Sequence, residues 1–225
     1  NGNFGISNVY KNLKMLSADE FRSTAKALGM TPLDMGGNTN FFDEIEQLGY
    51  TQNHNISFGA GNVDSNRRAS VGVIDQQGII KNSGMKNYTA KLDASQNMFN
   101  NKLKIEFGMF GSLKQVDYTN DYEKTFYSAA TYNPTFPTHK NEDGKWDEDP
   151  YANEIQNPLG RLEIQDREKN AYVNVHGKLT WTILDGLKLS AFGSYTYNVK
   201  ENMKYIPKDL KAITQTSDAH GYRAD

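Results

Sequence analysis

The sequence predicts an all-β protein, an antiparallel meander that forms part of a large transmembrane β-barrel. Three observations carry this prediction. Residues 171–202 alternate between apolar and polar side chains on both sides of the break Leu184-Asp185-Gly186, and a period of two with an Asp-Gly turn indicates a β-hairpin. The connections between the predicted strands alternate between short and long. The strands themselves run to nearly twice the mean strand length of about 5–6 residues.

Seven strands follow from the same alternation. In the fifth, Leu103 and Ile105 share one parity, and Lys104 and Glu106 share the other. Such patterning is typical of strands with one apolar and one polar face. The predicted strands are 4–13, 50–61, 67–76, 88–98 and 103–113, and the two arms of the 171–202 hairpin.

The connections predict how the strands are arranged. Strands two and three are joined by "NVDSN", four and five by "FNNK", and six and seven by "LDG". The other connections cover 14–49, 77–87 and 114–170. In an antiparallel meander successive connections fall at opposite ends, so all the long ones lie at one end. Loops longer than about 12–15 residues are uncommon in compact domains and are usually functional.

Two short helices are expected within the first long connection. In "LSADEFRSTAKALG", Ser17 is a good N-cap, Glu20 completes a capping box and Gly29 is a natural stop. "NFFDEIEQLG" predicts a second helix. Both helices belong to the loops of a β protein.

The composition excludes several classes of protein and of binding site. A net charge of -2 gives no electrostatic attraction to nucleic acid, and the lack of cysteine excludes a disulfide framework and thiolate metal sites. The mean hydropathy is -0.73, and no apolar run is long enough for a transmembrane helix. A transmembrane barrel passes this test, because its strands alternate and their average hydropathy is low.

The alternating faces favour a barrel in a membrane over a soluble sandwich. Trp181 lies beside a short turn, whereas Tyr195 and Tyr197 lie toward the long-loop end, where the two aromatic girdles of a barrel fall. The alternative is a soluble carbohydrate-binding β-sandwich, whose strands also alternate. Small residues on the apolar parity, such as Gly177 and Ala191, fill a sandwich core poorly.

The sequence also resembles a known family. The segments "LKMLSADEFRSTAKALG", "YTQNHNISFGAGNVDSNRRASVGVIDQQGIIKNSGMKNYTAKLDASQNMFNNKLKIEFGMFGS" and "NAYVNVHGKLTWTILDGLKLSAFGSYTYN" are similar to the early barrel strands of SusC-like TonB-dependent transporters of Bacteroidetes. Arg68 stands where that family usually has an aromatic residue. The resemblance implies a 22-stranded barrel in the cell outer membrane, with an N-terminal plug and a TonB box. No plug or TonB box is recognised, so residues 1–225 are expected to be the N-terminal part of the barrel, about seven strands.

The family resemblance further implies a function. Its members import large nutrients, mostly oligosaccharides and in some cases peptides, with energy delivered through TonB. The implied partners are a SusD-like surface lipoprotein that closes over the barrel, TonB itself, the transported substrate and outer-membrane lipid. A passive porin or adhesin barrel is the alternative within the barrel class.

The search for a reactive site finds no catalytic motif, so neither an enzyme nor a cofactor is expected. The four histidines lie apart and match no metal or catalytic spacing. Candidate contacts for a substrate or partner are Trp146, in the acidic loop 141–150, and Tyr132 and Phe136, in "FYSAATYNPTFPTH". The carboxylates of loop 141–150 could gather a calcium ion. Their spacing does not fit an EF-hand, so a solvated acidic loop is favoured.

Overall fold

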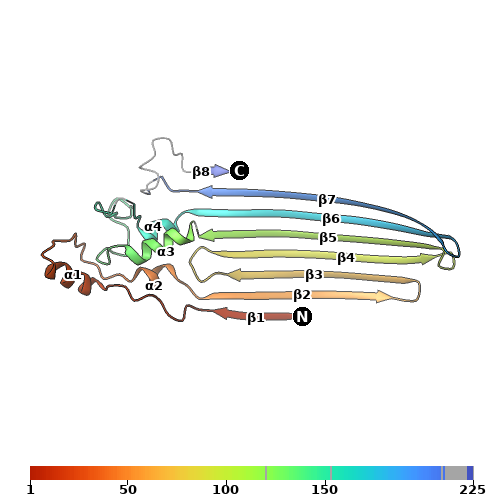
Figure 1. Ribbon diagram of the computed structural model, residues 1–225, viewed down its shortest axis with the longest axis horizontal. Helices are drawn as coiled ribbons and strands as arrows, with labels where there is room; N and C mark the ends of the chain where they lie inside the picture. The colour runs from red at the N-terminus through yellow and green to blue at the C-terminus, as the bar shows by residue number, and fades with distance from the viewer. Residues whose placement is uncertain (120, 153, 209, 211–221, 225) are drawn as a thin grey trace.

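The computed structural model describes residues 1–119, 121–152, 154–208, 210 and 222–224. They form one long antiparallel sheet with a group of helices at one end (Figure 1). Each strand pairs with its neighbours in the sequence, so the sheet is a meander. The strands are β1 (Gly2–Ser7), β2 (Gly49–Gly61), β3 (Ser65–Gln77), β4 (Gly84–Met98), β5 (Leu103–Thr119), β6 (Gln165–Leu184), β7 (Leu187–Tyr205) and β8 (Tyr222–Ala224).

The connections divide between the two ends as predicted. Tight turns join β2 to β3, β4 to β5 and β6 to β7 at one end, which we call the turn end (Figure 1). Connections 8–48, 78–83 and 120–164 lie at the other, the loop end. The helices of the loop end are α1 (Ala18–Ala27), α2 (Phe41–Ile45), α3 (Tyr122–Thr131) and α4 (Pro158–Leu162).

The two helices predicted in the first long connection are confirmed. The side chain of Ser17 accepts a hydrogen bond from the backbone N–H of Glu20, and the Glu20 carboxylate accepts one from the backbone N–H of Ser17. This reciprocal pair satisfies two of the N–H groups that a helix start leaves without partners. At α2, the side chain of Asn40 accepts from the backbone N–H of Phe42.

Several predicted bounds differ from the structure. The first strand ends at Ser7 rather than residue 13, because its partner strand β2 begins at Gly49, the residue that pairs with Ser7. β5 and β6 extend beyond the predicted bounds, since residues 114–119 pair with 165–170, where the parity of the apolar face becomes polar and the alternation disappears. Helices α3 and α4 and the short strand β8 were not predicted.

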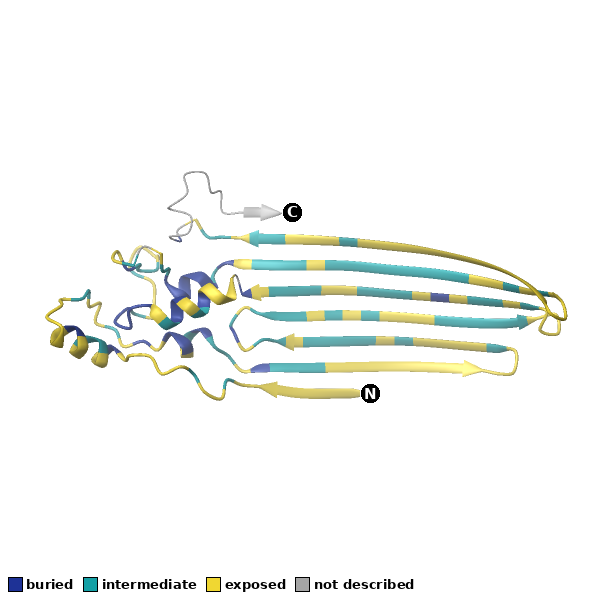
Figure 2. Ribbon diagram, in the orientation of Figure 1, coloured by how far each residue is buried: buried dark blue, intermediate teal, exposed yellow. Residues whose placement is uncertain are grey.

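The sheet is a single layer, and this excludes the predicted alternative of a β-sandwich. Within the described residues no second sheet packs on either face, and large strand side chains stay open, such as Leu189 at 59% exposure (Figure 2). The buried hydrophobic residues gather mainly in the loops. The main cluster comprises Phe41, Phe42, Ile45, Ile80, Ala129, Tyr132, Phe136, Leu159 and Leu162.

The register aligns the apolar parities of neighbouring strands into one surface, the apolar face. Met109 of β5 lies opposite Val175 of β6, which lies opposite Tyr195 of β7. On this face no charged residue occurs between positions 103 and 115 of β5, 171 and 181 of β6, or 189 and 199 of β7. These runs are at least as long as the approximately 9–11 residues of a membrane-spanning strand. The opposite parity forms the polar face.

No helix in the described part of the chain has the length and apolar character needed to cross a membrane.

Candidate functional site

The loops at the loop end pack into one body, which we call the loop assembly (residues 8–48, 78–83 and 120–164, as described). Its centre is aromatic: the ring of Tyr132 packs edge-on against Phe41, with centroids 5.3 Å apart, and against Phe136, at 5.1 Å. Phe41 comes from the first long connection, and the other two come from the third. The aromatic core therefore fixes two distant loops against each other.

Backbone hydrogen bonds reinforce this junction, in which residues 33–39 run beside residues 133–136. The Gly37 N–H donates to the Thr135 carbonyl over 2.7 Å, and the Thr39 N–H donates to the Pro134 carbonyl over 2.9 Å. A Cβ on Gly37 would lie 2.6 Å from that Thr135 oxygen. Only glycine at position 37 permits the two backbones to approach this closely. We call this junction of residues 33–39 and 133–136 the loop clasp.

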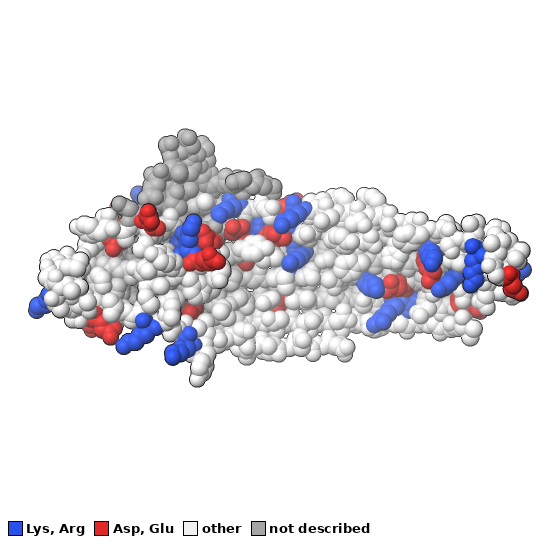
Figure 3. Space-filling model, in the orientation of Figure 1, with Lys and Arg blue, Asp and Glu red and all other residues white. Residues whose placement is uncertain are grey.

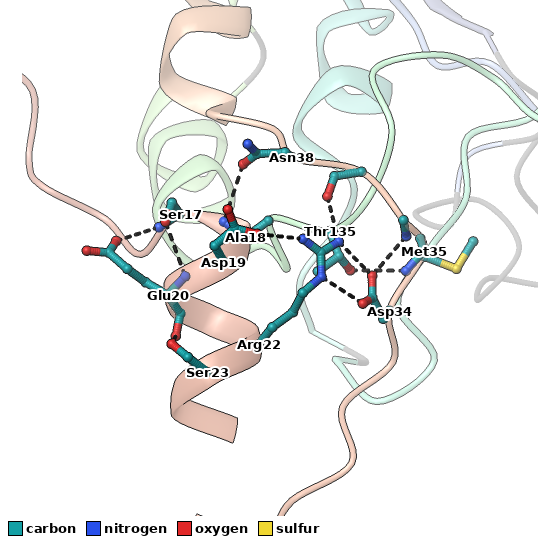
Figure 4. Close-up of polar contacts among 12 residues, drawn as sticks. Ser17, Ala18, Asp19, Glu20, Arg22, Ser23, Asp34, Met35, Asn38 and Thr135 are labelled. Carbon is teal, nitrogen blue, oxygen red and sulfur yellow. Dashed lines mark hydrogen bonds and ion pairs between the residues drawn. The ribbon is translucent and has the colours of Figure 1, made fainter. Parts of the chain in front are cut away.

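An arginine fork holds helix α1 to the clasp (Figure 4). Arg22 donates from Nε and Nη2 to the two carboxylate oxygens of Asp34, over 2.7 and 2.9 Å, and Nη2 also donates to the Gly37 carbonyl. The Arg22 hydrogen bond is the main cause that lowers the pKa of Asp34 to about 2, and the Gly36 N–H contributes further. Such bidentate pairing fixes orientation as well as distance.

Tyr132 and Phe136, two of the predicted contact residues, lie inside the loop assembly, 5% and 1% exposed. The Tyr132 hydroxyl donates to the Asp147 carbonyl over 2.9 Å and accepts from the Asp149 N–H over 3.1 Å. Burial, and then the nearby Glu148 carboxylate, raise the pKa of this hydroxyl. The rings of Tyr132 and Phe136 both pack inside the loop assembly. Their contact with a substrate or partner stays a prediction.

Trp146, the third predicted contact residue, is half-buried at the surface of the loop assembly. Its indole N–H donates to Glu163 Oε1 over 2.9 Å, and Lys140 Nζ lies 5.8 Å from the ring centroid while pairing with Glu163 at 2.8 Å. Its ring also lies over Gly160, where a Cβ would be 3.2 Å from Cδ1. Trp146 is thus held in place at the edge of the buried cluster, and its contact with a substrate or partner stays a prediction.

The acidic loop 141–150 uses its carboxylates to order itself. Asp147 Oδ1 accepts from the Asn141 side chain over 2.9 Å, Asp149 Oδ1 accepts from the Tyr151 N–H, and Glu148 Oε2 accepts from the Asn157 N–H. Among the described residues, no three His, Cys, Asp or Glu side chains are grouped to hold a metal ion. Calcium binding in this loop therefore has no support from the geometry.

Two hollows open at the loop end. One, of about 500 Å³, lies between residues 13–17 and 38–41 on one side and residues 129–134 on the other. The larger, of about 850 Å³, lies where strands meet loops and has polar walls that include the pairs Asp75–Lys86 and Asp117–Arg167. Both hollows are bordered by the long connections.

The polar face carries paired charges and a few aromatic rings. Lys91 pairs with Asp93 at 3.1 Å, and Lys104 pairs with Glu106 at 2.7 Å. The visible surface in Figure 3 shows charged groups gathered toward the two ends, with uncharged side chains between them. A face with these groups suits an aqueous lumen, which tolerates charge where lipid does not.

Sequence reasoning missed the residues that hold Trp146. Glu163 binds both the indole and Lys140, yet it lies 17 residues from Trp146 in the chain. No periodicity links such positions. The one usable signal was "NPLGRL", since Asn157 followed by Pro158 is a typical helix start; α4 begins there and positions Glu163 as its C-cap.

The fold and the loop assembly define a segment of barrel wall with elaborate loops at one end. No family model matches the chain. It is 27% identical over 197 residues to the TonB-dependent receptor SusC of Bacteroides thetaiotaomicron, covering 76% of this chain and 19% of that protein. It is 22% identical over 222 residues to the TonB-dependent receptor P3 of Formosa agariphila, covering 94% of this chain and 22% of the relative. The chain thus spans about a fifth of the length of these curated relatives.

Solved structures give the same result for the fold. The RagAB peptide importer in its closed-closed state superposes with a TM-score of 0.69 at 16% identity, covering 99% of this chain and 30% of that one. The open-open state gives a TM-score of 0.68 at 17% identity. The predicted antiparallel meander, part of a large β-barrel, is confirmed, and so is the resemblance to SusC-like TonB-dependent receptors, at partial coverage.

Proposed function

We propose that residues 1–225 form the N-terminal part of the barrel wall of a TonB-dependent outer-membrane importer. One observation carries this proposal: the sheet has an apolar face, uncharged along the central parts of β5, β6 and β7, that no other layer of the described residues covers. Lipid is the surrounding that suits such a face, because backbone groups are paired within the sheet and no charge has to be desolvated. The proposal assigns the chain to transport and gives it no catalytic role.

Large nutrients are the proposed cargo, with oligosaccharides favoured by the family resemblance. The polar face, with ion pairs such as Lys91–Asp93 and Lys104–Glu106, suits hydroxylated or amide-rich molecules. Peptides are the second candidate, and the observation that favours them is the similarity of fold to a structure titled as a peptide importer.

A SusD-like lipoprotein is the proposed lid, and its contact surface is the loop assembly near α1 and Trp146. Helix α1 projects from the loop end (Figure 1), and the half-buried Trp146 is held by Glu163. A docking protein needs such fixed groups, because ordering mobile loops on binding costs entropy.

The test is growth of the native bacterium after deletion of the gene, on defined oligosaccharides and on defined peptides. The proposal expects loss of growth on one class, with the same loss when TonB is removed. Uptake that continues undiminished without TonB contradicts an energised importer and favours a passive barrel. Loss on peptides alone selects the second cargo.

A further inference from the structure

A groove on the apolar face lies at the turn end, far from the loop assembly. Its volume is about 500 Å³, and its walls are almost wholly apolar. The groove is lined by Phe99, Lys102, Leu103, Leu179, Trp181, Leu189 and Ala191. None of these residues takes part in the loop assembly, so the groove is a separate feature.

The sheet register builds the groove across three strands. Leu103 of β5 lies opposite Trp181 of β6, which lies opposite Leu189 of β7. Leu179 lies opposite Ala191, whose small side chain leaves the hollow between larger neighbours. Trp181 is 51% exposed, so an occupant from outside the chain can reach the apolar walls.

The β4–β5 turn closes the groove at its outer end. Phe99, Asn100 and Asn101 all have positive φ, at 55°, 54° and 65°. Asparagine adopts this conformation readily, whereas for a bulky residue such as Phe99 it is uncommon and costs energy. The turn therefore keeps an unfavourable conformation that sets the Phe99 ring at the groove.

Lys102 supplies the single charge of the groove. Its backbone is fixed, because its N–H donates to the Phe99 carbonyl over 3.2 Å and its carbonyl accepts from the Thr182 N–H over 2.7 Å. Its side chain is exposed and forms no ion pair with the described residues. The nearest lysine in sequence, Lys104, lies on the polar face and is paired with Glu106.

We propose that the groove binds an acyl chain of a membrane phospholipid with an anionic headgroup, and that Lys102 pairs with the headgroup phosphate. The apolar walls match a hydrocarbon chain, and the one cation lies at the turn end, where the uncharged face ends and headgroups begin. Lysines and tryptophans at this level interact with the polar region of a bilayer. The inference rests on the proposed membrane location.

The test uses the full-length protein that contains this chain, made free of cysteine and reconstituted into vesicles. Leu187→Cys carries a small fluorophore beside the groove, two residues from Leu189 on the same face, and Leu113→Cys carries it at the loop end of that face. Vesicles contain brominated phosphatidylglycerol or brominated phosphatidylcholine at equal mole fraction. Bromine quenches only fluorophores that the acyl chains touch.

The expected result is an enrichment of the anionic lipid at position 187 of about fivefold, the factor that one lysine near anionic lipid supplies. No such preference is expected at position 113. Lys102→Gln abolishes the enrichment and Lys102→Arg keeps it, with heat-modifiable migration reporting that each variant is folded.

Equal quenching by the two lipids at position 187, or an enrichment that survives Lys102→Gln, overturns the lipid site. Disulfide linkage between unlabelled Leu187→Cys copies would instead assign the groove to a second copy and also overturn it. An absence of quenching at both positions refutes the membrane location, and with it the proposed function.

Discussion

A charge placed on the apolar face should destabilise the barrel, whereas the same charge one residue away should not. Val175 and Asn174 are neighbours on β6 and point to opposite faces. Val175 lies midway along the uncharged stretch, opposite Met109 and Tyr195. The two variants, Val175→Arg and Asn174→Arg, therefore place the same guanidinium at the same depth but on opposite faces of the sheet.

The magnitude follows from the depth of Val175. An arginine on the lipid face at the bilayer midplane costs about 2–4 kcal/mol. This lowers the ratio of folded to unfolded protein by about 30- to 800-fold, since about 1.4 kcal/mol is a factor of ten. Asn174→Arg loses a hydrogen bond from Asn174 to Thr196, made over 2.8 Å at an exposed position. That loss is worth about 1 kcal/mol or less.

The assay is reversible urea unfolding of the full-length protein in lipid vesicles. The folded fraction at each urea concentration is read from the heat-modifiable electrophoretic mobility of the protein. Val175→Arg should lower the urea midpoint clearly, and Asn174→Arg should leave it close to the parent value. Equal losses in the two variants would refute the assignment of the apolar face to lipid. A larger loss for Asn174→Arg would mean that the polar face, and not the apolar face, contacts lipid.

Three further predictions concern the loop assembly. Ser17→Ala removes the capping box and should weaken α1 by about 1 kcal/mol, seen as faster amide exchange in α1 and not in the strands. Because Arg22 depresses the pKa of Asp34 from 3.8 to about 2, the fork stabilises the fold above about pH 4, and its contribution is lost as pH falls toward 2. Amide exchange rates measured across this pH range should show the loss. An unchanged exchange profile would exclude the fork. Gly37→Ala brings a methyl against the Thr135 carbonyl and should cost about 1–3 kcal/mol, measured as lost protection of residues 37 and 39.

The sheet was predictable because its signal is local and repeated. In β5, Leu103 to Met109 alternate with Lys104 and Glu106, and no other structure satisfies both faces at once. The ends of the strands were not predictable, because the alternation fades where β5 and β6 leave the apolar face. Their pairing there depends on partners such as Asp117 and Arg167, which are 50 residues apart.

The candidate site was less predictable for a related reason. Tyr132, Phe136 and Trp146 stand out in the sequence as loop aromatics, but composition does not tell a buried ring from an accessible one. That difference is set by Phe41, from another loop, and by Glu163, beyond the acidic loop. Tertiary contacts of this kind leave no periodic trace in either segment.

The loop clasp also sets an order of events during biogenesis. Each strand of the meander adds beside the one made just before it, so the sheet can grow hairpin by hairpin from local contacts. The clasp is different, because the Asn133 side chain bonds the Leu33 carbonyl across 100 residues. Closing it is least costly in entropy once β2 to β5, which lie between the two segments, have paired. We therefore expect the clasp to close after these strands are in place.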